Sequence, residues 1–246
     1  MRMLLPVPAD PVDPAEVYAD QPTADGRPSL RLNMIVSVDG GTAWNGVSGA
    51  LGGPADKSLF AVLRGLADMV LVASGTMRAE GYGPATLPEP VRTARVARGQ
   101  RPVPPIAVVT RTCDFDWESP FFTEATERPV IVTVRAADAT QVARAEDVAD
   151  VVIAGDDDVD LARAVAALGE RGARTILAEG GPTLNGDLAQ AGLLDEVCLS
   201  LSPTLASGDA KRIIAGSTLD ELERLALHSI AEQDGYLFLR YRPTRT

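Results

Sequence analysis

The chain is short of the side chains that most enzymes use for acid–base, nucleophilic and metal chemistry. Its 246 residues contain one histidine and two cysteines, which disfavours a His-ligated zinc, a four-cysteine zinc site and a Ser-His-Asp hydrolase. Lys57 and Lys211 are the two lysines among 23 basic residues, so Schiff-base chemistry has few candidates. This scarcity favours chemistry that a bound cofactor supplies and the protein positions, hydride transfer above all.

Long apolar runs are missing as well. No stretch approaches the ~18 residues that a membrane span requires, and the opening segment ends too early for the apolar region of a signal peptide. Cys113 and Cys198 are too few for a disulfide framework, so both are expected to be reduced thiols. These observations predict a cytoplasmic protein with no membrane partner and no metal centre.

Positive charge is scarce relative to negative charge. The 23 basic and 34 acidic residues give a net charge of −11, which argues against the phosphate-backbone attraction used by nucleic-acid binders. The one basic run is expected to be a solvated helix face: Arg92, Arg95, Arg98 and Arg101. An anionic small molecule would therefore have to be met by a few local cations.

What the chain has is a regular alternation of strand and helix patterns. Residues 1–29 hold six prolines and are expected to form an irregular arm packed over a single domain, residues 30–246. Helical patterns at 56–66 and 160–168 lie between apolar runs, which is typical of a mostly parallel α/β sheet with helices on both faces. Seven short runs predict the core strands: residues 32–38, 69–73, 106–110, 130–134, 151–154, 175–178 and 197–201.

The end of the chain changes character. Two extended runs, 225–231 and 236–241, flank Asp234-Gly235, a dipeptide that suits a two-residue hairpin turn. An antiparallel hairpin is therefore expected to close the sheet. His228 lies in the first run, where a half-exposed sheet residue is a simpler interpretation than a catalytic base.

The turn at residues 177–186 is the strongest candidate site, because ligands of open α/β sheets bind at the carboxyl ends of strands. Gly180 and Gly181 let the backbone approach a ligand, and Pro182 suits the first position of a helix whose free N–H groups favour a pyrophosphate. A plain strand–helix turn explains the glycines equally well. Glu179 favours a ligand site, because a carboxylate at the end of a buried strand needs a partner such as a substrate hydroxyl or amine.

A second turn, at residues 70–80, again joins a strand to the start of a helix. Thr76 either caps this helix or also reaches a cofactor. The sequence lacks both a GxGxxG fingerprint after a first strand and an acidic residue placed to hold a ribose 2′-hydroxyl. Arg111 follows the strand at 106–110, where a guanidinium suits a 2′-phosphate. NADPH is therefore the expected dinucleotide.

Two further features each have two interpretations. The glycine-rich stretch 46–54 is either a flexible connection or a loop that brings N–H groups and Ser48 against a substrate phosphate. Arg64 interrupts the apolar face of the helix at 56–66, so it is either a structural ion-pair residue or a phosphate contact.

Five motifs follow one another along about residues 30–242: Ser37-Val38-Asp39-Gly40, Leu63-Arg64 with Ala67-Asp68, Ser74-Gly75-Thr76, Glu179-Gly180-Gly181-Pro182-Thr183-Leu184 and Leu194-Asp195-Glu196. Their order and spacing resemble the reductase domain of riboflavin biosynthesis, whose fold is dihydrofolate-reductase-like. The ordered set is far more specific than any one of the motifs.

The resemblance implies NADPH-dependent reduction of 5-amino-6-(5-phosphoribosylamino)uracil, or of its 2,5-diamino-pyrimidinone counterpart, to the ribityl compound by a homodimer. It implies Glu179 and Asn33 as catalytic residues near the reacting ribose, and Ser48, Arg64 and Asp39 as substrate contacts. The implied cofactor contacts form a larger set: Met34, Ser74, Gly75, Thr76, Glu80, Arg111, Gly180, Gly181, Pro182, Thr183 and Leu184.

The sequence also departs from the family pattern. The zinc deaminase motifs of bifunctional members are absent, so the chain corresponds to the reductase half. Glu80-Gly81-Tyr82 replaces an acidic pair with proline, and Ala50 replaces an aromatic residue. Two other functions stay open: a different NADPH-dependent reductase, such as one for dihydrofolate, and a non-catalytic nucleotide or phosphosugar binder. The presence of both Glu179 and Arg64 favours a phosphorylated polyhydroxy substrate, because a pterin has no phosphate for Arg64 to meet.

Overall fold

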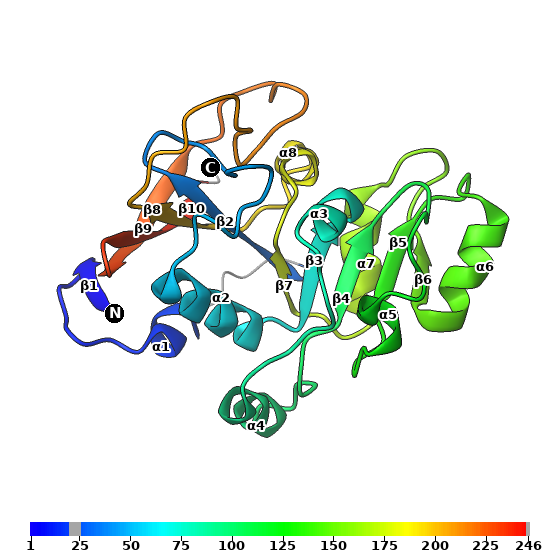
Figure 1. Cartoon of the computed structure of the whole chain (residues 1–246), viewed down its shortest axis with the longest axis horizontal. Coiled ribbons are helices and arrows are strands. Elements are labelled where there is room, and N and C mark those ends of the chain that lie inside the picture. The colour runs from blue at the N-terminus through cyan, green and yellow to red at the C-terminus, as the bar shows by residue number, and fades with distance from the viewer. Residues whose placement is uncertain (20–25, 245–246) are drawn as a thin grey trace.

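One ten-stranded sheet runs through the whole molecule in the computed structural model, which describes residues 1–19 and 26–244. The strand order is β1-β9-β10-β8-β2-β7-β3-β4-β5-β6, as Figure 1 shows. Strands β2 to β8 are parallel to their neighbours within that group, whereas β1, β9 and β10 pair antiparallel. The bounds are β1 Arg2–Leu5, β2 Ser29–Ser37, β3 Met69–Ala73, β4 Ile106–Val109, β5 Val130–Thr133, β6 Asp150–Ile153, β7 Thr175–Ala178, β8 Glu196–Ser202, β9 Leu225–Gln233 and β10 Tyr236–Pro243.

Helices cover both faces of the sheet. Helices α7 and α8 contribute buried side chains to a core cluster on one face, and α1, α2, α3 and α6 contribute to clusters on the other. The short α5 adds two phenylalanines to the second face. The bounds are α1 Pro14–Ala19, α2 Pro54–Leu66, α3 Ser74–Ala79, α4 Glu89–Ala97, α5 Pro120–Thr123, α6 Ala139–Val148, α7 Leu161–Glu170 and α8 Pro182–Gln190.

The predicted fold class is confirmed, and the reason lies in the short apolar runs. Every residue of β5 and β7 is buried, because strands in the middle of a parallel sheet are covered on both faces. At the hairpin, Asp234 and Gly235 both take positive φ, 55° and 82°, which is the conformation that a two-residue turn between twisted strands requires. Each predicted core strand is present, with ends that differ by three residues at most.

Residues 1–19 of the N-terminal arm pack against the rest of the chain, and they are not irregular throughout. Strand β1 pairs with β9, and Tyr18 of α1 is buried in a cluster with α2. The guanidinium of Arg31 donates to the carbonyl oxygen of Tyr18 at 3.2 Å, and that of Arg240 donates to Val17 at 2.5 Å. Four strand residues and six helix residues are too few to show a periodicity, so tertiary partners decide this structure.

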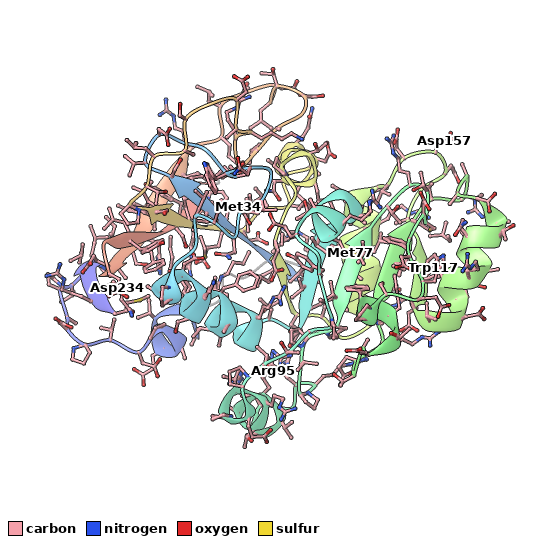
Figure 2. The ribbon with its side chains drawn as sticks, in the orientation of Figure 1. Met34, Met77, Arg95, Trp117, Asp157 and Asp234 are labelled. Carbon is pink, nitrogen blue, oxygen red and sulfur yellow. The ribbon has the colours of Figure 1, made fainter. Side chains whose placement is uncertain are left out.

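The interpretation of the basic run as a solvated face is wrong at Arg95. Arg92, Arg98 and Arg101 are exposed, but Arg95 is completely buried where α4 meets the end of α2 (Figure 2). Its Nη1 atom donates to the carbonyl oxygens of Gly65 and Ala67 at 3.0 and 2.6 Å. These are carbonyls at the end of α2 that have no partner within the helix, so a cation from another helix satisfies them.

We expect Arg95→Met to lower the free energy of unfolding by about 2–4 kcal/mol, because the buried Ala67 carbonyl loses this donor and Gly65 keeps only the Arg98 Nη2 donor at 2.8 Å. Urea denaturation measures the effect. Arg92→Met is the matched control: Arg92 is exposed on the same helix and pairs only with Glu89, so its loss should change stability by less than about 0.5 kcal/mol. Equal effects of the two variants would contradict the role assigned to Arg95.

Candidate active site

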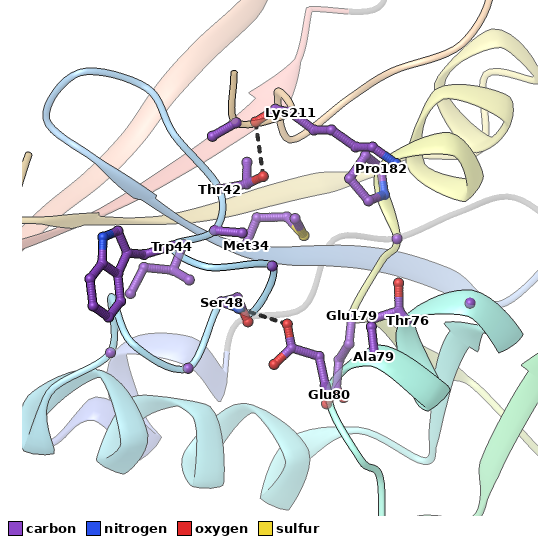
Figure 3. A pocket seen from close by; sticks show the side chains of 18 of the residues that line it. Met34, Thr42, Trp44, Ser48, Thr76, Ala79, Glu80, Glu179, Pro182 and Lys211 are labelled. Carbon is purple, nitrogen blue, oxygen red and sulfur yellow. Dashed lines mark hydrogen bonds between the residues drawn. The ribbon is translucent and has the colours of Figure 1, made fainter. Parts of the chain in front are cut away.

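The carboxyl ends of β2, β3 and β7 open into a cavity of about 1260 Å³ (Figure 3). Its walls come from six parts of the chain: β2, the loop 42–52, one face of α2, α3 with the turn that follows it, the start of α8, and the segment 206–211. These strands are neighbours in the parallel part of the sheet, so their ends and the following helix starts meet at one edge. The cavity therefore lies where the sequence predicts a ligand site.

A buried carboxylate stands at the floor of this cavity. Glu179 follows the last residue of β7, and its side chain is 2% exposed. The Arg64 Nε and Nη2 atoms donate to Oε1 and Oε2 of Glu179, each at 2.7 Å, and the Tyr82 hydroxyl donates to Oε2 at 2.8 Å. These three hydrogen bonds offset the cost of removing the carboxylate from water, which is several kcal/mol for an unpaired ion.

Aromatic rings enclose the cation of this pair. The Arg64 guanidinium carbon lies 4.4 Å from the ring centre of Phe60 and 5.5 Å from that of Tyr82. Burial lowers the pKa of Arg64, but the Glu179 carboxylate outweighs that effect and raises the pKa above its usual value. Burial and then the negative charge of Glu179 raise the pKa of Tyr82, so its phenol stays a proton donor to the carboxylate. The structure forms the ion pair that one interpretation of Arg64 predicts, and the phosphate contact stays a prediction.

The turn after Glu179 brings two strand ends into contact. Gly180 has a φ of 92°, which favours glycine, and its carbonyl oxygen accepts the Ala73 N–H at 2.7 Å. A Cβ atom on Gly181 would collide with the Thr76 hydroxyl. Helix α8 then starts at Pro182 without any side-chain cap on its first turn. Its free N–H groups and positive dipole end are therefore available to an anion.

Side-chain hydrogen bonds fix the loops around the cavity. Glu80 accepts the Ser48 N–H at 2.7 Å, which ties the loop 42–52 to the end of α3 (Figure 3). The Thr42 hydroxyl donates to the carbonyl oxygen of Lys211 at 2.8 Å. Asp39 accepts the N–H groups of Ala206 and Ser207, at 3.0 and 2.7 Å. Hydrogen bonds from the Ser37 hydroxyl and then from these N–H groups lower the pKa of Asp39 to about 2.

Most of the predicted site residues meet in this one cavity. Its lining includes Asn33, Met34, Ser48, Arg64, Gly75, Thr76, Glu80, Glu179, Gly181, Pro182, Thr183 and Leu184. Ser74, Gly180, Asp39 and Arg111 are outside the lining. Asp39 instead holds the segment 206–211 in place, and Arg111 forms an exposed ion pair with Asp158.

Lys57, Tyr82 and Lys211 are among the lining residues that were not singled out as site residues from the sequence. The sequence signal for Lys57 and Lys211 was their rarity in an arginine-rich chain. Both of them line this cavity. Lys57, Phe60 and Arg64 also follow the three- and four-residue spacing of one helix face. For Tyr82 the sequence signal was that this position departs from the family pattern.

Comparison with known proteins agrees with this geometry. Residues 28–236 match the model of the RibD C-terminal domain family. The chain belongs to the RibD C-terminal domain family. The resemblance drawn from the five motifs is thereby confirmed.

Named relatives of this RibD C-terminal domain chain are reductases. The 2,5-diamino-6-ribosylamino-4(3H)-pyrimidinone 5′-phosphate reductase of Methanothermobacter thermautotrophicus is 30% identical over 200 residues, which cover 80% of this chain and 88% of the relative. The enzyme of the same name from Aquifex aeolicus is 26% identical over 207 residues, covering 81% and 88%.

Solved structures share the fold of this family member. A pyrimidine reductase-like protein from Corynebacterium diphtheriae is 28% identical, with a TM-score of 0.80 over 89% of this chain and 93% of that chain. RibD of Acinetobacter baumannii, 20% identical, has a TM-score of 0.71 over 90% of this chain and 59% of its own. In residues 1–19 and 26–244 no helix is long and apolar enough to cross a membrane. Within the same residues no three His, Cys, Asp or Glu side chains gather as a metal site requires.

Breaking the buried ion pair tests its structural importance. We expect Arg64→Met to lower the free energy of unfolding by about 3–5 kcal/mol, because Glu179 keeps a buried charge without its cation. Urea denaturation measures this change. Arg78→Met is the control, because Arg78 is exposed on the neighbouring α3 and should change stability by no more than about 0.5 kcal/mol. An Arg64→Met protein of normal stability would show that Glu179 is satisfied by other groups.

Proposed function

We propose that this chain is an NADPH-dependent reductase of 5-amino-6-(5-phosphoribosylamino)uracil, or of its 2,5-diamino-pyrimidinone counterpart, and that it converts the ribosyl group to ribityl. The observation that carries the proposal is the buried Glu179 carboxylate beside the first turn of α8, in one cavity. The names of the relatives from Methanothermobacter thermautotrophicus and Aquifex aeolicus support the substrate class. A homodimer in the cytoplasm remains a prediction of the sequence.

The cavity fits a dinucleotide at its α8 side. The first turn of α8 is uncapped and lines the cavity at Gly181 and Pro182, so its N–H groups can meet a pyrophosphate. A Cβ on Gly75 would have no neighbour within 4 Å, which leaves the start of α3 open to a ligand. We place the cofactor against these residues, Thr76 and Met34. Bound NADPH supplies the hydride of the reaction.

The protein residues then hold the sugar in its reactive form. Reduction at the anomeric carbon requires the ring-opened iminium, which is positively charged across its carbon–nitrogen bond and becomes the neutral amine when the hydride adds. The Glu179 carboxylate can accept a hydrogen bond from the amine or from a sugar hydroxyl and stabilise that charge. Arg64 and Tyr82 hold the carboxylate in place, and Asn33 offers its amide from β2 in the same cavity.

Substrate and cofactor phosphates need cations, and the cavity has few. The described lining contains three basic residues: Lys57, Arg64 and Lys211. The charge of Arg64 is already matched by Glu179, whereas Lys57 and Lys211 form no ion pair with any residue in the described part of the chain. Figure 3 shows the Lys211 side chain running beside Pro182, on the cofactor side. We therefore add the two lysines to Ser48 and Arg64 as proposed contacts of the phosphate groups.

Arg111 is the proposed partner of the cofactor 2′-phosphate. Its ion pair with Asp158 is largely exposed and therefore weak, so the guanidinium is free to change partner. Arg111 is close enough to Asp187 of α8 to lower the pKa of that carboxyl, which burial and then Asp158 raise. This supports the proposal, because the cofactor is proposed to lie on the same α8 side.

We expect Arg111→Ala to weaken NADPH binding by about 1.5–3 kcal/mol and to leave NADH binding unchanged, because a single charge-assisted contact is lost. Fluorescence titration of both cofactors measures the difference. Arg128→Ala removes a comparable exposed ion pair, with Asp150, and should alter neither affinity. Equal weakening of NADPH and NADH by Arg111→Ala would contradict the 2′-phosphate assignment.

The activity itself is tested by NADPH oxidation with the phosphoribosylamino-uracil and, separately, with dihydrofolate. We expect turnover of the pyrimidine, and a fall in kcat of about 10²–10³ in Glu179→Gln with nearly unchanged NADPH affinity, because the charge that stabilises the imine is lost. Weak NADPH binding with a normal kcat would mean that Glu179 only braces the Gly180-Gly181 turn. Oxidation with dihydrofolate alone would assign a different reductase, and no oxidation at all would leave a binding protein.

A further inference from the structure

The hydrogen bonds to Glu179 are unevenly divided between its two oxygens. A carboxylate offers about four acceptor positions, two on each oxygen. Arg64 and Tyr82 fill both positions on Oε2, from Nη2 and from the phenol, whereas Oε1 accepts only the Arg64 Nε–H among the donors of residues 1–19 and 26–244. One acceptor position, on Oε1, is therefore left for a ligand.

The position of Tyr82 is fixed by its own contacts, so Tyr82 can determine how the hydrogen bonds are divided between Oε1 and Oε2 of Glu179. It follows Gly81, whose φ of 63° turns the chain back after α3, and its own N–H donates to the carbonyl oxygen of Met77 at 3.0 Å. The ring lies against the Arg64 guanidinium, and the hydroxyl reaches Glu179. Ring and hydroxyl thus fix the cation and the carboxylate from one side.

We propose that Tyr82 is a positioning residue of this reductase, which occupies Oε2 of Glu179 and leaves Oε1 to accept the substrate's N–H or O–H. The inference rests on the proposed function, because it needs a substrate with such a donor. In this proposal Tyr82 acts on neither the reacting carbon nor the hydride. Its effect passes through Glu179 alone.

The orientation matters because a hydrogen bond stabilises developing charge only when its acceptor is aimed at the donor. Without the phenol, both oxygens of Glu179 have one free position each, and the two Arg64 hydrogen bonds alone hold the carboxylate, which leaves it freer to rotate. The substrate would then be held in more than one geometry, and misplacement by about 1 Å can cost a factor of 10² in rate.

The test compares two Tyr→Phe changes that each delete one hydroxyl. We expect Tyr82→Phe to lower kcat by about 10- to 100-fold while NADPH affinity stays unchanged. Tyr236→Phe is the matched control: its hydroxyl is buried and donates at 2.9 Å to the carbonyl oxygen of Leu51, which keeps the Ser202 hydroxyl as a second donor, and Tyr236 is not among the residues lining the cavity. Its kcat should stay within about twofold of the original protein.

A double variant shows whether Tyr82 acts through Glu179. In a Glu179→Gln background the Tyr82→Phe change should cost less than about twofold in kcat, because the carboxylate that it orients is already gone. A Tyr82→Phe protein with the original kcat, or one that loses the same factor in both backgrounds, would overturn the proposal.

Crystal structures of the original and Tyr82→Phe proteins provide a test that needs no turnover. We expect the Glu179 carboxylate to rotate or to occupy two orientations in the variant; an unchanged, fully ordered carboxylate would overturn the inference. If the original protein does not turn over the pyrimidine, the proposed function fails while this structural comparison still decides the role of Tyr82.

Discussion

A carboxylate buried at the end of a central strand is the constraint on which the site depends. Glu179 is fixed in sequence to the last position before the Gly180-Gly181 turn, so its charge must be met by side chains from elsewhere. Helix α2 supplies Arg64 and the turn after α3 supplies Tyr82. The ion pair therefore ties three elements to one another at the edge where β3 and β7 end. The same contacts shape the cavity wall and leave part of the carboxylate for a ligand.

Buried arginines hold the surrounding fold by the same principle. Arg95 fills the unpaired carbonyl groups at the end of α2, the helix that carries Arg64. On the antiparallel side of the sheet, Glu196 accepts hydrogen bonds from Arg31 and Arg240, and those arginines also hold the carbonyls of α1. Arginine suits this role, because its planar group can donate to a carboxylate and to backbone oxygens at the same time. An arginine-rich chain can thus connect distant segments inside its core.

The sequence predicted the central architecture because local chemistry dictates it. Fully buried strands read as continuous apolar runs, and a turn such as Asp234-Gly235 encodes its own backbone geometry. The strand-end position of Glu179 and the glycines that follow it were readable for the same reason. Local patterns failed where an element is short, as in β1 and α1, and where one residue of a polar series turns inward, as Arg95 does.

Sequence alone thus determined the fold class, the edge of the sheet at which the cavity lies and most of the predicted residues that line it. The tertiary structure decided which side chains bind the Glu179 carboxylate. Arg64 and Glu179 are 115 residues apart, and Tyr82 is 97 residues from Glu179, so no local pattern encodes their hydrogen bonds. A buried carboxylate forms hydrogen bonds with the donors that packing brings within about 3 Å of it. Packing depends on the whole chain. For that reason the sequence could name the carboxylate but not the residues that orient it.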